Sequence, residues 1–178
     1  DLLVEDVLSV SNLLNAKKKS NCTNRVQYQV LIRDKIINFD LRYVGDNYYD
    51  NRWQKSMLKN RIFESYYFRA NLEDYYYSLI CHALLHKPRF SADYKKRIFI
   101  MQKEVNKLKE KVEMSKITLL NELLLFLKRN SYSLTQPNDY SVYWNYRFNL
   151  KCLPVLNIRR LFFRVPYFIN NKLRNLFN

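Results

Sequence analysis

A single glycine, Gly45, is present among the 178 residues of the chain. Glycine reaches positive φ without steric cost, and the tight loops that hold phosphates in nucleotide-binding enzymes depend on it. With one glycine available, most such loops are excluded. The sequence is nevertheless 48% hydrophobic, which is enough apolar material for a buried core. We therefore expect a folded protein that is not an enzyme and that uses no cofactor.

Positive charge is the second constraint on function. Lysine and arginine number 31 against 16 acidic residues, which gives a formal charge of +15. Such an excess favours binding to polyanions. Part of the lysine content fits the compositional bias of an AT-rich genome, whereas arginine is harder to explain in that way and suits bidentate contact with phosphate. The composition therefore predicts contact with nucleic acid.

Cysteines and histidines offer little for a metal site. Cys22, Cys81 and Cys152 are far apart in the sequence and include no CxxC pair, so neither a zinc ribbon nor a disulfide framework is indicated. His82 and His86 are four residues apart on a predicted helix, but no third ligand accompanies them. We expect no metal site.

The first part of the chain predicts a small α+β head over residues 1–53. Apolar residues in 2–14 have helical spacing. Residues 26–44 alternate between apolar and polar on both sides of the break Arg33-Asp34-Lys35, which is typical of a β-hairpin that ends near Gly45.

A long antiparallel helical hairpin is expected over residues 54–127. Residues 54–86 fit one helix that ends at Lys87-Pro88, because proline cannot continue a helix. A second helix begins after Ser91. Its apolar residues alternate in steps of four and three, which indicates a coiled-coil-like seam: Tyr94, Ile98, Met101, Val105, Leu108, Val112, Ser115 and Leu119. Such a seam is more often used for packing than for function, and we expect it to mediate protein contacts.

Residues 128–178 form an extended basic tail in this prediction. Asp139 is its only acid, and aromatic residues and three prolines are interleaved with the cations. Guanidinium groups and rings stack on RNA bases while cations neutralise phosphates. The alternative is that the aromatic rings pack on the head and the cations are merely solvated. The predicted RNA-binding cations are Lys128, Arg129, Arg147, Lys151, Arg159, Arg160, Arg164, Lys172 and Arg174.

Two short pieces of this tail resemble the fourteenth small-subunit ribosomal protein family. Leu127-Lys128-Arg129-Asn130-Ser131 resembles the family's Leu-Pro-Arg-Asn-Ser motif, and residues 158–164 are similar to its later Ile-Ser-Arg-Ile-Val-Phe-Arg stretch. The family's Gly-Arg-Pro loop and its C-terminal Lys-x-Ser-Trp motif are absent. The resemblance implies that ribosomal RNA lies against Arg129, Asn130, Arg159, Arg160 and Arg164.

The composition as a whole looks like that of divergent mitochondrial ribosomal proteins encoded in AT-rich organellar genomes. This likeness implies a mitochondrial structural subunit that contacts rRNA through its tail and neighbouring ribosomal proteins through its helical hairpin, with no small-molecule substrate. The alternative is a helical accessory subunit of a mitochondrial inner-membrane respiratory or ATP synthase complex, in which the basic tail meets anionic lipid headgroups. No run of about 18 apolar residues occurs, so we expect no transmembrane helix.

Overall fold

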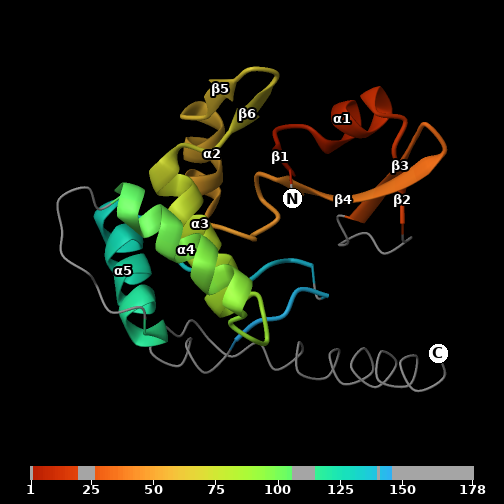
Figure 1. The fold of residues 1–178 in the computed structure, drawn as a ribbon. Helices are drawn as coiled ribbons and strands as arrows, with labels where there is room; N and C mark the ends of the chain where they lie inside the picture. The colour runs from red at the N-terminus through yellow and green to blue at the C-terminus, as the bar shows by residue number, and fades with distance from the viewer. Residues whose placement is uncertain (1, 20–26, 106–114, 140, 146–178) are drawn as a thin grey trace.

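The computed structural model describes residues 2–19, 27–105, 115–139 and 141–145. Figure 1 shows a small sheet near the N-terminus beside a group of packed helices, with a second, short hairpin projecting at the top of the view. The fold is α+β and mostly helical, which confirms the predicted class. Residues 146–178, the larger part of the predicted tail, lie outside the described residues.

The N-terminal sheet is built on the predicted β-hairpin. Its strands are β1 (Leu2–Val4), β2 (Lys17–Lys18), β3 (Gln27–Ile32) and β4 (Lys35–Tyr43), in the order β1-β4-β3-β2. β3 and β4 are antiparallel and joined by Arg33 and Asp34, which both have positive φ, as a type I′ hairpin turn requires. The prediction of a hairpin over residues 26–44 is confirmed.

The prediction of one helix over residues 2–14 is correct only for its second half. Leu2–Val4 is a strand because it pairs in parallel with the end of β4, where Leu2 is opposite Leu41. The helix α1 (Val7–Leu13) begins after Asp6, whose carboxylate accepts a hydrogen bond from the backbone N–H of Leu8 at 2.9 Å. This N-cap satisfies one of the amide groups that a helix start leaves unpaired.

The prediction of a single helix over residues 54–86 is wrong. This region contains α2 (Asn51–Lys59), an antiparallel hairpin of β5 (Ile62–Glu64) and β6 (Tyr67–Arg69), and α3 (Leu72–Leu85). Ser65 in the hairpin turn has a positive φ of 55°, which a helix does not allow. Asn71 caps α3 by accepting a hydrogen bond from the backbone N–H of Asp74 at 2.9 Å.

The heptad seam also does not lie on one helix. Its residues are divided between α4 (Ala92–Val105) and α5 (Lys116–Arg129), and Leu108 and Val112 lie outside the described residues. Ser115 has an extended backbone and caps α5 by accepting from the N–H of Thr118 at 3.0 Å. The expected antiparallel hairpin is formed by α3 and α4, which end and begin on either side of Lys87-Pro88.

The buried core lies between α2, α3, α4 and α5. Its largest members include Trp53, Tyr76, Ile98 and Leu123. The boundary predicted after residue 53 falls inside α2, and the one after residue 127 falls inside α5. The first aromatic residues of the predicted tail pack on this core: Tyr132 stacks on Trp53 at 6.0 Å between ring centroids, and Trp144 is 7% exposed. These rings therefore pack on the helical core, whereas the alternative places the aromatic rings of the tail on the head.

Candidate nucleic-acid interface

Three of the predicted RNA-binding residues lie at the end of α5. Lys128 and Arg129 are in its last turn, and Asn130 is its C-cap. The guanidinium of Arg129 donates to Oε1 of Glu73 on α3 at 2.6 Å, and both side chains are more than half exposed. The amide of Asn130 donates to the carbonyl oxygen of Phe126 at 2.9 Å. Lys128 and Arg129 are therefore presented at the surface, whereas the Asn130 amide closes the helix end.

The other predicted contacts remain predictions, because they lie outside the described part of the chain. They are Arg147, Lys151, Arg159, Arg160, Arg164, Lys172 and Arg174.

Several acidic side chains are directed into the protein interior. Asp46, Asp50, Asp74 and Asp139 are each at most 7% exposed, whereas Arg42 is the corresponding buried cation among the described residues. These carboxylates are held by hydrogen bonds. Asp46, for example, accepts from the amide of Gln54 at 2.7 Å. With four carboxylates and one arginine buried, the exposed charged side chains of the described residues are richer in cations than the sequence of these residues.

Burial and hydrogen bonding act in opposite directions on two of these acids. Burial raises the pKa of Asp46 above its usual value, against hydrogen bonds from Tyr48 and Gln54 and the charge of Arg42. Burial also opposes ionisation of Asp50, but backbone N–H groups of Ser133, Arg52 and Trp53 outweigh it, and the pKa of Asp50 is lowered. Asp50 thereby caps α2 and holds the segment after α5 in place.

The remaining exposed acids are largely engaged by arginine. The ion pairs between described residues all use arginine, and the exposed ones join it to Glu5, Glu64, Glu73 and Asp93. Lysines instead extend into solvent. The exposed lysines of the described residues include Lys17, Lys19, Lys35, Lys55, Lys59, Lys95, Lys96, Lys116 and Lys128. The surface thus combines paired arginines with lysines available to external anions.

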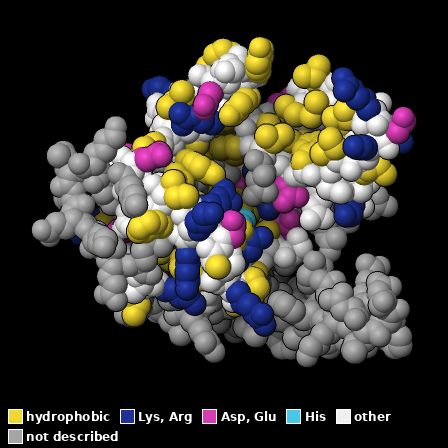
Figure 2. Space-filling view, viewed as in Figure 1, with side chains coloured by type: hydrophobic (Ala, Val, Ile, Leu, Met, Phe, Trp, Pro, Cys, Tyr) yellow, Lys and Arg dark blue, Asp and Glu magenta, His cyan; other side chains and the backbone are white. Residues whose placement is uncertain are grey.

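One group of cations follows the connection between α3 and α4 and the start of α4. We call it the basic ridge, and it consists of Lys87, Arg89, Lys95, Lys96 and Arg97. Figure 2 shows dark-blue side chains gathered over α4 on this face. Arg97 also donates to the hydroxyl of Tyr75 at 2.6 Å. The ridge brings cations of the α3–α4 connection together with cations of the first turns of α4.

Two histidines, the half-buried His82 and the buried His86, lie close to the basic ridge. The Nε2 of His82 is 2.9 Å from the hydroxyl of Tyr94, and its Nδ1 shares a hydrogen bond with the hydroxyl of Tyr48. His86 is 3% exposed, and its ring lies 4.2 Å from that of Tyr48 and stacks on Trp144. Among the described residues, neither ring nitrogen of His86 has a hydrogen-bond partner. The pair fixes α3 against the segment before α2 and against α4.

Both histidines are neutral at pH 7. Burial, followed by the charges of Lys87, Arg42 and Arg97, lowers the pKa of His82 to about 4. Burial, followed by the neighbouring His82, places the pKa of His86 well below its usual value. Within the described residues, no three metal-ligating side chains come together. From the sequence these histidines are only a pair on one helix face, because their tyrosine partners are distant in the chain.

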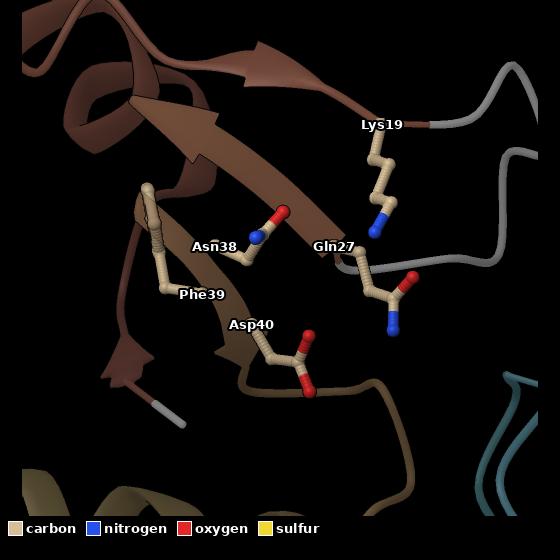
Figure 3. A pocket seen from close by; sticks show the side chains of 5 residues that line it. All are labelled: Lys19, Gln27, Asn38, Phe39 and Asp40. Atoms are coloured by element: carbon tan, nitrogen blue, oxygen red, sulfur yellow. The ribbon is translucent and has the colours of Figure 1, made fainter. Parts of the chain in front are cut away.

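A small pocket lies on the N-terminal sheet (Figure 3). It has a volume of about 220 Å³ and is lined by Lys19, Gln27, Asn38, Phe39 and Asp40. Its groups include one cation and one carboxylate, so it does not favour an anion over a cation. It lies at the ends of β2 and β3 that flank residues 20–26, which are not among those described.

Exposed apolar side chains on the β5–β6 hairpin were missed by the sequence analysis. Ile62, Phe63, Tyr66, Tyr67 and Phe68 are all exposed. The available signal was the alternation on either side of Ser65, but the same residues also fit helical spacing. Within the described residues, no helix has the length and apolar character needed to cross a membrane.

Comparisons with protein-family models, with curated proteins and with solved structures found no match to this chain.

Proposed function

We propose that the protein is a structural subunit of an RNA-containing assembly, and that this assembly is the mitochondrial ribosome. The observation that supports the proposal is the separation of charge between interior and surface. Four carboxylates are buried and hydrogen-bonded, while lysines and the basic ridge face solvent. A surface of this kind attracts the phosphate backbone of RNA regardless of base sequence.

Arg129 illustrates how an existing contact can be exchanged for a phosphate. Its ion pair with Glu73 is exposed on both sides. Exposed ion pairs contribute only about 0–1 kcal/mol to stability, so a phosphate group can compete for the guanidinium at small cost. Lys128, one residue earlier, adds a second cation at the same helix end. In this proposal the helix end starts the RNA contact, and the predicted tail cations continue it.

The rival proposal is an accessory subunit of a mitochondrial inner-membrane complex. Exposed phenylalanine and tyrosine side chains together with cations are also suited to a lipid interface. The two proposals differ in what holds the protein in its assembly: RNA in the first, and membrane proteins and lipid in the second.

The assembly is tested by sedimentation of a native mitochondrial extract on a density gradient, with and without ribonuclease. Under our proposal the chain travels with ribosomal particles, and ribonuclease moves it to the top of the gradient. If it remains with a detergent-solubilised membrane complex after ribonuclease treatment, the ribosomal proposal fails and the rival replaces it.

A second experiment tests the RNA contact directly. Fluorescence anisotropy with a labelled RNA is measured against salt concentration for the parent, for Lys95→Gln/Lys96→Gln and for Lys17→Gln/Lys19→Gln. Each lost phosphate contact reduces the salt slope of binding by about one. We expect the basic-ridge variant to lose about two and the control, which removes equal charge from the sheet, to keep the parent slope. Equal losses in both variants contradict a defined interface at the ridge.

A further inference from the structure

The β5–β6 hairpin carries apolar side chains on both of its faces. Phe63 and Phe68 are directly opposite each other in the strand register, with ring centroids 5.1 Å apart, and are 62% and 58% exposed. Ile62 and Tyr67 belong to the other face, because side chains alternate along a strand, and they are exposed as well. Tyr66, in the turn, is 96% exposed. Apolar side chains therefore lie on both faces and at the turn, and the face of Ile62 and Tyr67 also carries the ion-paired Glu64 and Arg69.

Its position makes these side chains accessible together. Figure 1 shows β5 and β6 projecting at the top of the view, away from α4 and α5. Figure 2 shows hydrophobic side chains at the same end of the molecule. Contiguous exposed apolar groups are uncommon on soluble surfaces and usually mark a binding surface.

Cations lie at the base of the hairpin. The guanidinium of Arg61 lies over the ring of Phe68, 4.8 Å from its centroid, and Nη1 is 3.7 Å from Glu5. Lys59, in the last turn of α2, is exposed. The one acid within the hairpin, Glu64, is paired with Arg69. The arrangement is an apolar tip with Lys59 and Arg61 at its base, where Arg61 is paired with Glu5.

We propose that this hairpin inserts into the surface of an anionic phospholipid bilayer. Apolar side chains on both faces suit a bilayer, which surrounds an inserted finger, better than a flat protein surface or an RNA strand, which covers one face. Phenylalanine and tyrosine partition into the region between headgroups and acyl chains. Lys59 and Arg61 then lie at the level of the anionic headgroups, where their charge is complementary.

Insertion is limited to the boundary between headgroups and acyl chains. The two-stranded sheet has unpaired backbone groups along both outer edges. Such edges do not occur in the hydrocarbon interior, because unpaired backbone groups are costly there. The proposal concerns a surface contact that is independent of RNA binding, and it holds whether or not the protein belongs to a ribosome.

The test uses the full-length chain with tryptophan placed in the turn. The native residues Trp53 and Trp144 are both buried, so they supply a constant background. Tyr66→Trp is mixed with vesicles of phosphatidylcholine alone or with one-fifth cardiolipin. We expect a blue-shifted emission, and quenching by brominated lipids, with the anionic vesicles. Leu125→Trp, on the exposed face of α5, is the matched control and should show neither change.

Two further variants separate the apolar and charged contributions. Phe63→Ser/Phe68→Ser should weaken partition into anionic vesicles by about tenfold or more, since two aromatic side chains no longer enter the interface. Lys59→Gln/Arg61→Gln should reduce the preference for anionic over neutral vesicles. Far-ultraviolet circular dichroism confirms that each variant remains folded.

Three outcomes overturn the proposal. In the first, the protein binds vesicles but Tyr66→Trp does not respond, so that another surface makes the contact. In the second, Tyr66→Trp is quenched by single-stranded RNA and not by vesicles, which makes the hairpin an RNA site. In the third, the parent does not bind anionic vesicles. None of these results depends on the ribonuclease experiment, so the proposed function and this inference can fail separately.

Discussion

The indole Nε1 of Trp53 donates a hydrogen bond to Oδ1 of Asp74 at 2.8 Å, and both side chains are buried. Trp53 is on α2 and Asp74 on α3, so this bond closes the base of the chain segment that forms the β5–β6 hairpin. The other carboxylate oxygen accepts from the amide of Asn71 at 2.7 Å. Both oxygens of a buried acid are thus occupied, and α2 is fixed to α3 independently of the hairpin turn.

Replacing Asp74 by alanine should destabilise the fold by about 1–3 kcal/mol, because it leaves the indole N–H buried without an acceptor. The measurement is the free energy of unfolding in urea. Asp93→Ala is the control: Asp93 is also in the first turn of its helix, but its side chain is exposed. We expect the control to lie within about 0.5 kcal/mol of the parent. Equal losses in the two variants contradict the role given to the Trp53 bond.

The Trp53–Asp74 bond also explains why part of the fold could not be predicted from sequence. Leu58, Ile62 and Tyr66 have spacing compatible with a helix, and the decision between helix and hairpin depends on contacts that join distant parts of the chain. The β3–β4 hairpin was predictable because its signals are local: alternation and the turn residues Arg33 and Asp34. Tertiary contacts override local preference where both patterns fit.

The candidate sites show the same limit. Lys128 and Arg129 could be identified from sequence because their charge and exposure are local properties. The burial of Asp46 and the hydrogen bonds of His82 could not be identified from the sequence. His82 bonds to Tyr48 and Tyr94, which are 34 and 12 positions away from it in the chain. The apparent heptad seam failed for a simpler reason: Ser115, which was counted as a seam position, is an N-cap that begins a new helix.

The two histidines should respond differently to replacement by phenylalanine. His82→Phe removes the partner of two tyrosine hydroxyls and should cost about 2 kcal/mol. His86→Phe replaces a ring whose nitrogens have no hydrogen-bond partner in the described part of the chain, and it keeps aromatic contact with Trp144. We expect its stability to equal or exceed that of the parent. Urea unfolding of both variants decides the matter, and a loss at His86 as large as that at His82 contradicts the prediction.

Stability should decrease as the pH is lowered below about 6.5. Above that value the histidines are neutral in both states and contribute no pH dependence. Below it the unfolded chain gains protons that the folded chain does not, because the pKa of His82 is lowered to about 4 and that of His86 lies further below its usual value. Each histidine then reduces the free energy of unfolding by up to about 1.4 kcal/mol per pH unit.

Urea unfolding at pH 7.5, 6.5 and 5.5 measures this dependence. His86→Phe is the matched control, and it should reduce the slope between pH 6.5 and 5.5 by roughly half because one of two histidines is removed. The raised pKa of Asp46 acts in the opposite sense, since the folded state then binds a proton more readily. Carboxyl groups affect the free energy of unfolding mainly at pH values near their usual pKa. The pH dependence between pH 6.5 and 5.5 is therefore expected to come from the histidines. A parent slope of zero in the window contradicts the prediction.

Trp144 tests whether the chain after α5 belongs to the folded body. Its ring is 7% exposed and stacks on His86 at 5.6 Å, and the backbone N–H of the next residue, Asn145, donates to the carbonyl oxygen of Leu85 at 2.8 Å. Truncation of a buried tryptophan to alanine removes this packing and should cost about 3–5 kcal/mol. Tyr66→Ala, at a side chain that is 96% exposed, is the control and should change stability by less than about 0.5 kcal/mol. If Trp144→Ala unfolds at the same urea concentration as the parent, residues 141–145 contribute nothing to the core, and the segment is a tail as the sequence first suggested. A large loss instead shows that residues 141–145 belong to the folded body.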